Sequence, residues 1–339
     1  MFKRIVQIDQ KSILYISFLI IFAALYSQTV KSAISLDTVK ATCAGIEVMG
    51  VDHELAEQIR KLSTLQIGDT LMLSEYDGYC KGTTKQIENN LTVGEVKCSY
   101  MVLSNGEFYL VLDILPIDAK GLIYRTIPYN PKGVVKLPEQ VLFLYNSLFN
   151  RSFELLSNYT NYEEYYDKGY LDYDDPVLHS IAEQLSVLAK KHNDDLLKII
   201  HYSPDRDERE AAGLLLSWSQ EPNNLRYIAD ADLLLDPDNA VRNNVARSYI
   251  HFMDRVKDKT ILTDIIPAYC KMAALPLHSD RNKALYCILE ILKAHPDMAY
   301  AINVDCKNNI TYIADMSVLD SVGGVAKEIV KLMEEAEGA

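Results

Sequence analysis

The spacing of hydrophobic and polar positions changes along the chain. It predicts strands mixed with helices in the first third and helices alone afterwards. The expected early elements are a strand, two helices and two strands, over residues 46–51, 53–62, 82–91, 95–103 and 107–115. Asp52 is a suitable N-cap for the first helix, and Asn105-Gly106 favours a hairpin turn between the last two strands. We therefore expect a small α+β domain over residues 40–118.

A connector over residues 119–175 should contain one helix, which begins near Glu139. The end of this connector, residues 158–175, is rich in tyrosines and acids. Asp172, Asp174 and Asp175 raise the possibility of a Ca²⁺ or partner site. A solvated acidic linker is the favoured interpretation, because the run lacks the spaced ligands and the distant Glu of an EF-hand loop.

Residues 176–339 contain a weak internal repeat. Three similar segments each contain an arginine, at Arg209, Arg242 and Arg281. The arginines are 33 and 39 residues apart. Each arginine begins a helix that has apolar positions at i and i+4, and other helical segments separate the three copies. A period of this size predicts stacked helical hairpins, each of which buries its apolar stripe against its neighbours.

The pattern Asp236-Pro-Asp-x-x-Val-Arg242 resembles the HEAT repeat, and the other two copies match it in part. The resemblance implies an all-α, armadillo-like solenoid over residues 176–339. It also implies a buried ladder in which aspartates and arginines of successive repeats pair. On this basis we expect Asp205 to lie with Arg209 and Asp236 with Arg242, in a role that stabilises the fold.

The N-terminal domain more loosely resembles a POTRA domain, the periplasmic docking module of outer-membrane transport proteins. The resemblance covers roughly 75 residues and rests on 46–50, 65–69, Cys43 before the first strand and Gly78-Tyr-Cys80 before the second helix. No β-barrel sequence follows, and a small α+β domain of another kind is an equal alternative. The predicted fold class is thus α+β followed by a helical-repeat array, mainly α.

The start of the chain has the pattern of an export signal. Lys3, Arg4 and Lys11 precede the uncharged apolar run Ile13–Tyr26. This run is shorter than the roughly 20 residues of a membrane span and suits a signal peptide over residues 1–32. An uncleaved single-helix anchor is the alternative. After cleavage we expect no stable membrane insertion and a periplasmic or secreted location.

The six cysteines of the chain all follow the predicted signal, so an oxidising compartment permits disulfides. We expect a structural disulfide between Cys43 and Cys80, which would tie the first strand to the second helix, with Cys98 as the rival partner of Cys80. The three C-terminal cysteines, Cys270, Cys287 and Cys306, are expected to be reduced and buried.

The net charge of −13 disfavours nucleic acid as a partner, because an acidic surface repels phosphate backbones. No nucleotide-binding, metalloprotease or hydrolase motif is present, so we predict no catalytic residue, no metal and no cofactor. The sequence favours an exported, non-catalytic protein–protein interaction scaffold or adaptor of the cell envelope. The alternatives are an accessory of an outer-membrane transport or secretion system that binds a client through the POTRA-like domain, and a HEAT-fold enzyme such as a lyase.

Overall fold

The computed structural model describes residues 40–103, 105–117, 124–130, 132–133, 135–157, 160 and 162–338. The predicted export signal, residues 1–32, lies outside these residues. The chain divides into two compact units. The first contains the chain up to Ala119 together with Met316–Gly323, and the second contains Lys120–Asp315 and Gly324–Ala339.

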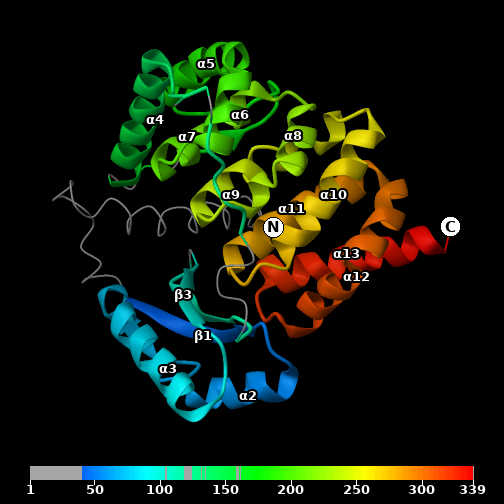
Figure 1. The fold of residues 1–339 in the computed structure, drawn as a ribbon. Coiled ribbons are helices and arrows are strands. Elements are labelled where there is room, and N and C mark those ends of the chain that lie inside the picture. The colour runs from blue at the N-terminus through cyan, green and yellow to red at the C-terminus, as the bar shows by residue number, and fades with distance from the viewer. Residues whose placement is uncertain are drawn as a thin grey trace, which may run out of the picture. The chain divides into compact units, whose positions relative to one another are not determined.

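The first unit is a four-stranded sheet with helices (Figure 1). Its elements are β1 (Lys40–Met49), α2 (His53–Leu62), β2 (Thr70–Met72), the 3₁₀ turn η2 (Leu73–Glu75), α3 (Tyr76–Asn90), β3 (Val96–Val102) and β4 (Glu107–Ile114). The strand order is β2-β1-β4-β3; β1 runs parallel to β4, and the other two pairs are antiparallel. The central strands β1 and β4 carry the longest apolar runs and are the most deeply buried.

Local sequence explains the boundaries of these elements. The Asp52 carboxylate accepts a hydrogen bond from the backbone N–H of Leu55 at 2.9 Å and so caps α2, as expected. Gly106 has a φ of +81°, which the tight connection between β3 and β4 requires. The short strand β2 was not predicted. It forms because Thr70, Leu71 and Met72 pair with the beginning of β1, a long-range contact that no local pattern encodes.

The segment Met316–Gly323 belongs to the first unit through a buried carboxylate. Glu47 points from β1 and is fully buried. Its side chain accepts hydrogen bonds from the Ser317 hydroxyl at 2.8 Å and from the backbone N–H of Val318 at 2.8 Å. A segment distant in sequence therefore completes this unit, a feature that the residue pattern does not indicate.

The second unit is helical apart from one short hairpin. Its elements are α4 (Glu139–Ser157), β5 (Glu164–Tyr165), β6 (Asp172–Tyr173), α5 (Pro176–Lys191), α6 (Asn193–Tyr202), α7 (Arg206–Ser219), α8 (Asn224–Asp230), η3 (Leu233–Leu235), α9 (Asn239–Arg247), η4 (Ile250–Arg255), α10 (Lys259–Ala273), α11 (His278–Ala294), η5 (Pro296–Met298), α12 (Ala299–Met316), the π-helical turn η6 (Asp320–Gly324), which begins in the first unit, and α13 (Val325–Glu337).

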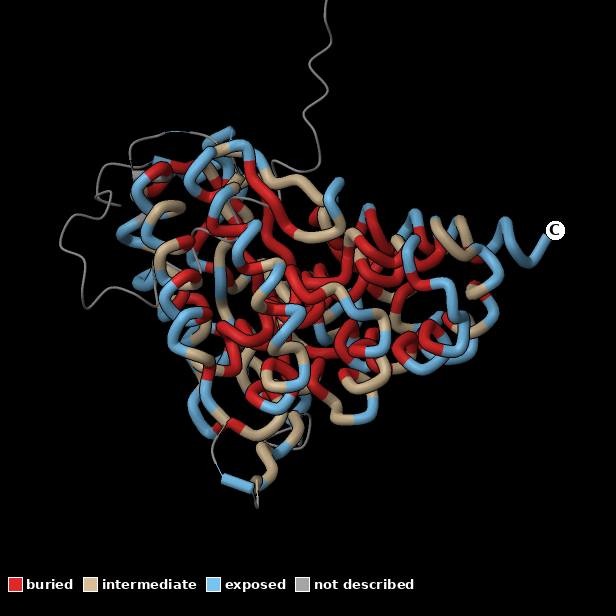
Figure 2. The backbone as a smooth tube through the Cα atoms, turned by 90° about the horizontal axis from the view of Figure 1, so that it is seen from above, coloured by how far each residue is buried: buried red, intermediate tan, exposed pale blue. Residues whose placement is uncertain are grey.

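Packing in the second unit follows the order of the helices. α5, α7, α9, α11 and α13 form a row in which each helix contacts the next. A second set of contacts joins α6 to α7, α8 to α10 and α10 to α11. Buried and exposed residues alternate along most helices, because one face packs inward (Figure 2). α7 and α11 are buried along most of their length, as befits helices with neighbours on both sides. No helix in the described ranges is long and apolar enough to cross a membrane.

The tyrosine-rich segment is more ordered than the favoured interpretation, a solvated linker, supposed. β5 and β6 pair, with Glu164 opposite Tyr173 and Tyr165 opposite Asp172. The Glu164 carboxylate accepts hydrogen bonds at 2.6 and 2.7 Å from the buried guanidinium of Arg247 in α9. This charge-assisted contact anchors the hairpin to the helices, and only the tertiary fold reveals it.

Candidate functional site

The predicted disulfide between Cys43 and Cys80 is wrong. Cys80 of α3 pairs with its rival, Cys98 of β3, and Cys43 is a free buried cysteine in β1. The reason is the sheet order, which places the edge strand β3, and not β1, against α3. The crosslink therefore fastens α3 to the edge of the sheet.

The expectation of three reduced C-terminal cysteines is also wrong. Cys270 of α10 and Cys306 of α12 form a second disulfide, whereas Cys287 is free and buried. The two bonded residues are 36 positions apart and lie on different helices. Sequence spacing alone could not bring them together. Two disulfides fit an oxidising compartment outside the cytoplasm.

A buried network of arginines and aspartates links successive helices of the second unit. Arg209 donates to both carboxylate oxygens of Asp236, at 3.0 and 3.1 Å. Arg242 donates in the same way to Asp280, at 3.0 and 2.6 Å. All four residues are almost completely buried. Each arginine thus bridges from its own helix to a later segment of the second unit with the bidentate geometry that makes such pairs strong.

A second contact recurs with a fixed spacing. Arg209, Arg242 and Arg281 each donate from Nη1 to the backbone carbonyl six residues earlier, at 2.9, 2.5 and 3.5 Å. The three arginines found in the sequence repeat therefore occupy equivalent positions. Each fixes the turn that enters its helix. We name the pairs Arg209–Asp236 and Arg242–Asp280, with these carbonyl contacts, the arginine ladder.

The pairings differ from those expected. Asp205 is exposed and does not contact Arg209 through its side chain; it caps α7 by accepting from the backbone N–H groups of Asp207 and Glu208. The Asp236 carboxylate accepts from Arg209 of α7. Arg242 donates only to the backbone carbonyl of Asp236. Asp280 was not assigned because it lies inside the first turn of α11, whereas the acids assigned in the other two copies lie beside a proline.

The connector also contributes to the ladder. The Arg125 guanidinium donates to Asp236 at 2.6 Å and to the carbonyls of Ile200 and His201 at 2.7 and 3.0 Å. The ring of Tyr124 lies 4.6 Å from the Arg242 guanidinium carbon, a cation–π distance. No local pattern around residues 124–125 signalled this role.

The acidic cluster considered for Ca²⁺ is used internally. Asp172 lies 2.7 Å from His179, Asp174 accepts from the backbone of Glu163, and Asp175 caps α5 and pairs with Arg151 at 2.7 Å. Within the described ranges no group of three or more His, Cys, Asp or Glu side chains could hold a metal ion. The structure thus gives these acids structural partners.

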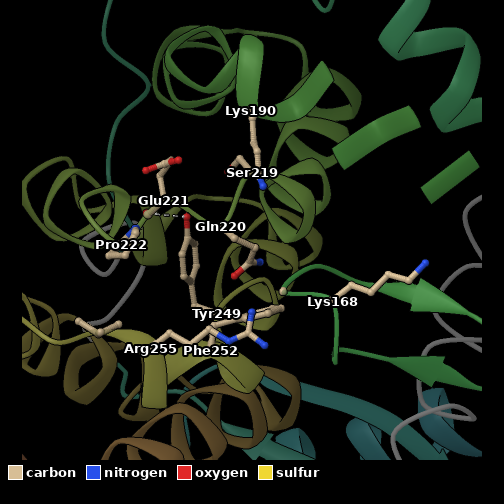
Figure 3. Close-up of a pocket in the computed structure, with 11 residues that line it drawn as sticks. Lys168, Lys190, Ser219, Gln220, Glu221, Pro222, Tyr249, Phe252 and Arg255 are labelled. Atoms are coloured by element: carbon tan, nitrogen blue, oxygen red, sulfur yellow. Dashed lines mark hydrogen bonds between the residues drawn. The ribbon is translucent and has the colours of Figure 1, made fainter. Parts of the chain in front are cut away.

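One cavity of the second unit is lined by charged, polar and aromatic side chains. Its volume is about 260 Å³, and it lies where the end of α7 meets α5, η4 and the turn between β5 and β6. The lining residues are Lys168, Gly169, Lys190, Ser219, Gln220, Glu221, Pro222, Tyr249, Phe252, Arg255 and Val256. Figure 3 shows Lys190 pointing toward Ser219 and Gln220, whereas Lys168 points away. We call this cavity the α7 pocket.

The floor of the α7 pocket is a fixed network. The buried hydroxyl of Tyr249 accepts from Asn224 at 2.8 Å and lies 3.4 Å from the carbonyl of Glu221 (Figure 3). Burial raises the pKa of Tyr249 well above its ordinary value, so the phenol stays neutral. The floor is therefore uncharged, and the charged groups of the pocket, three cations and Glu221, lie around it. No pattern in the sequence indicates this pocket.

A buried lysine with a lowered pKa lies elsewhere in the same unit. Lys283 of α11 donates to Asn282 at 3.1 Å, and burial lowers its pKa to about 8. Enzymes use such lysines as nucleophiles. Lys283 does not line the α7 pocket. The position of this lysine therefore offers no specific support for the enzyme alternative.

Comparison of the chain with protein-family models, with curated proteins and with solved structures gives no match.

Proposed function

We propose that the chain is an exported protein–protein interaction scaffold of the cell envelope, of the HEAT-like solenoid type, and that it is not an enzyme. The observation that carries the proposal is the arginine ladder. Arg209 joins α7 to the segment before α9, and Arg242 joins α9 to α11, each through a buried bidentate pair. Such pairs hold consecutive helices in one register, and stacked helices present an extended surface to partners.

Exposed apolar side chains on the helical unit support binding rather than catalysis. Phe143 of α4 is 68% exposed and Tyr300 of α12 is 79% exposed. Aromatic side chains of this kind are enriched where proteins bind one another. The two disulfides support a location outside the cytoplasm, which agrees with the export signal expected from the sequence.

Affinity capture with surface variants tests this function. The full exported protein, oxidised and tagged at its C-terminus, is used to capture partners from cell-envelope extracts. Phe143→Ser and Tyr300→Ser change exposed side chains at two separate places, so each controls for the other. We expect one discrete partner to be retained by the wild type and lost with one of the two variants. If wild-type protein retains nothing above an untagged control, the scaffold function is rejected.

A second candidate, client binding by strand addition, is favoured by the edge position of β3. Among the described residues β3 pairs with β4 alone, and Lys97 and Ser99 of this strand are exposed. An extended client segment could add to such an edge. Hydrogen exchange of the full protein, with and without an unfolded outer-membrane β-barrel protein, tests this idea. Added protection within 96–102 would support client binding, and unchanged exchange there would exclude it.

A further inference from the structure

Two cations at the rim of the α7 pocket have no carboxylate partner among the described residues. Lys190 makes no ion pair, and Arg255 contacts only a backbone carbonyl and an aromatic ring. The chain has 47 acids against 34 lysines and arginines, and other arginines of this unit, such as Arg206 and Arg226, pair with acids. Glu221 is the one acid of the lining, so these two cations leave the pocket with a positive balance of charge, which favours an anionic ligand.

Arg255 is held over the pocket by its surroundings. Its Nη2 donates to the carbonyl of Tyr166 at 3.1 Å, and its guanidinium carbon lies 4.8 Å from the centre of the Phe252 ring. Gly169 lies against it, and a Cβ at that position would collide with Nη1. Gly169 also has a φ of +85°, where other residues are strained. These contacts restrict the exposed guanidinium, and such restriction lowers the entropic cost of binding an anion.

The pocket also contains a hydrogen-bond acceptor in a defined orientation. The side-chain nitrogen of Gln220 donates to the carbonyls of Leu216, Ser217 and Ser248, at 3.3, 2.9 and 2.9 Å. Three carbonyls around the nitrogen fix which end of the amide is oxygen. That oxygen, Oε1, is buried and accepts no hydrogen bond from any residue that the structure describes.

The backbone of Gln220 is explained by the helix that it ends. Its φ of +52° is the left-handed conformation of the C-cap of α7, and its backbone N–H donates to the carbonyl of Leu216. The unsatisfied side-chain oxygen has no such explanation in the fold, and it indicates a ligand with an N–H donor.

We propose that the α7 pocket binds the carboxyl-terminal residue of a partner polypeptide. Arg255 and Lys190 bind its carboxylate, Gln220 Oε1 accepts from its amide N–H, and its side chain packs on Phe252 and Val256. A volume of about 260 Å³ lies below the range of about 300–1,000 Å³ that is usual for small-molecule pockets, and it suits one residue. The inference rests on the proposed scaffold function and specifies the partner's contact.

Fluorescence anisotropy of labelled peptides with the full oxidised protein tests the inference. The probes are a pool of six-residue peptides with varied C-terminal residues, the same pool with an amidated C-terminus, and free amino acids as unlabelled competitors. We expect peptides with a free carboxylate to bind and their amidated forms to bind at least about tenfold more weakly, since a charge-assisted hydrogen bond is lost. Competition by free amino acids at equal concentration would assign the pocket to a metabolite and overturn the proposal.

Variants of the rim separate binding from folding. Arg255→Gln and Lys190→Gln should each weaken the carboxylate-bearing peptides at least about tenfold. Lys191→Gln is the matched control, because Lys191 is the neighbouring exposed cation of α5 and does not line the pocket. Because Lys190 makes no contact in the fold that its loss would break, Lys190→Gln remains informative if Arg255→Gln unfolds.

Two outcomes overturn the proposal: equal affinity for free and amidated peptides, or equal weakening by Lys190→Gln and Lys191→Gln. Neither outcome would contradict the proposed scaffold function if the wild-type protein still captures a partner that Phe143→Ser or Tyr300→Ser loses. A failed capture together with carboxylate-dependent peptide binding would reject the scaffold and keep the pocket as a peptide site.

Discussion

Breaking one rung of the arginine ladder should destabilise the helical unit strongly. Arg242 is 1% exposed, and its partner Asp280 is fully buried. Arg242→Met removes the guanidinium and leaves the Asp280 carboxylate without this partner. Loss of one member of a buried ion pair costs about 3–5 kcal/mol, and the lost hydrogen bond to the carbonyl of Asp236 adds about 1 kcal/mol.

The second arm of the experiment removes both charges. In Arg242→Met/Asp280→Leu no carboxylate remains to be stranded at position 280, and apolar replacement of a buried pair is often neutral or stabilising. We therefore expect the double variant to recover most of the loss seen in the single variant. The pair would then act by fixing which helices meet, with little net contribution to stability.

The chain contains a convenient reporter for this cycle. Trp218 is the only tryptophan and is fully buried in α7, so its fluorescence follows the helical unit selectively. Arg242→Met should lower the midpoint of thermal unfolding by about 8–24 °C, since the loss of about 4–6 kcal/mol corresponds to about 2–4 °C for each kcal/mol. A loss below about 1 kcal/mol, or a double variant less stable than Arg242→Met, would refute the account of the ladder.

Three further predictions concern titration, packing and crosslinking. Burial raises the pKa of Glu210 from 4.5 to about 7, so between these values the native state keeps a proton that the unfolded chain releases, and stability falls as the pH rises. In urea unfolding, the difference in stability between Glu210→Gln and wild type should grow by about 3 kcal/mol from pH 4.5 to 7.5, and a constant difference would contradict this. Val245→Asp buries an unpaired carboxylate, which costs several kcal/mol, so limited proteolysis should begin within 206–255 before it reaches α13, whereas Val245→Ala should be cut much later. Cys98→Ser opens a loop with a sequence separation of 18 and should cost about 3 kcal/mol; peptide mapping that finds Cys80 as a free thiol in the wild-type protein would contradict the assignment.

Much of the local structure could be predicted because its causes are local. The helix over His53–Leu62 begins where Asp52 caps it, and the repeat of arginines marks helices α7, α9 and α11. Apolar periodicity and capping chemistry act over a few residues, so a single sequence displays them.

The features that could not be predicted from the sequence depend on contacts between distant residues. Strand β2 exists only because it pairs with β1, and Met316–Gly323 joins the first unit through Glu47. Both disulfide corrections have the same origin, since the partner of each cysteine is decided by sheet order and helix packing. A pattern of spacing along one chain does not contain this information.

The candidate site was less predictable than the fold. The arginines of the ladder were visible as a repeat, but their aspartate partners lie one segment further along the chain. Gln220, Lys190 and Arg255 belong to three different elements and share no motif. Only the tertiary fold brings them to one pocket, where an unsatisfied amide oxygen marks the position.

Cross-linking in living cells tests the scaffold function most directly. Lysine-reactive cross-linker is applied to intact cells that make the tagged full-length protein, and linked peptides are identified by mass spectrometry. We predict links from exposed lysines of the helical unit, such as Lys191 or Lys331, to one recurrent partner protein outside the cytoplasm. Links confined to this chain itself, at expression levels where its own lysines react fully, would contradict the proposal that it is an interaction scaffold.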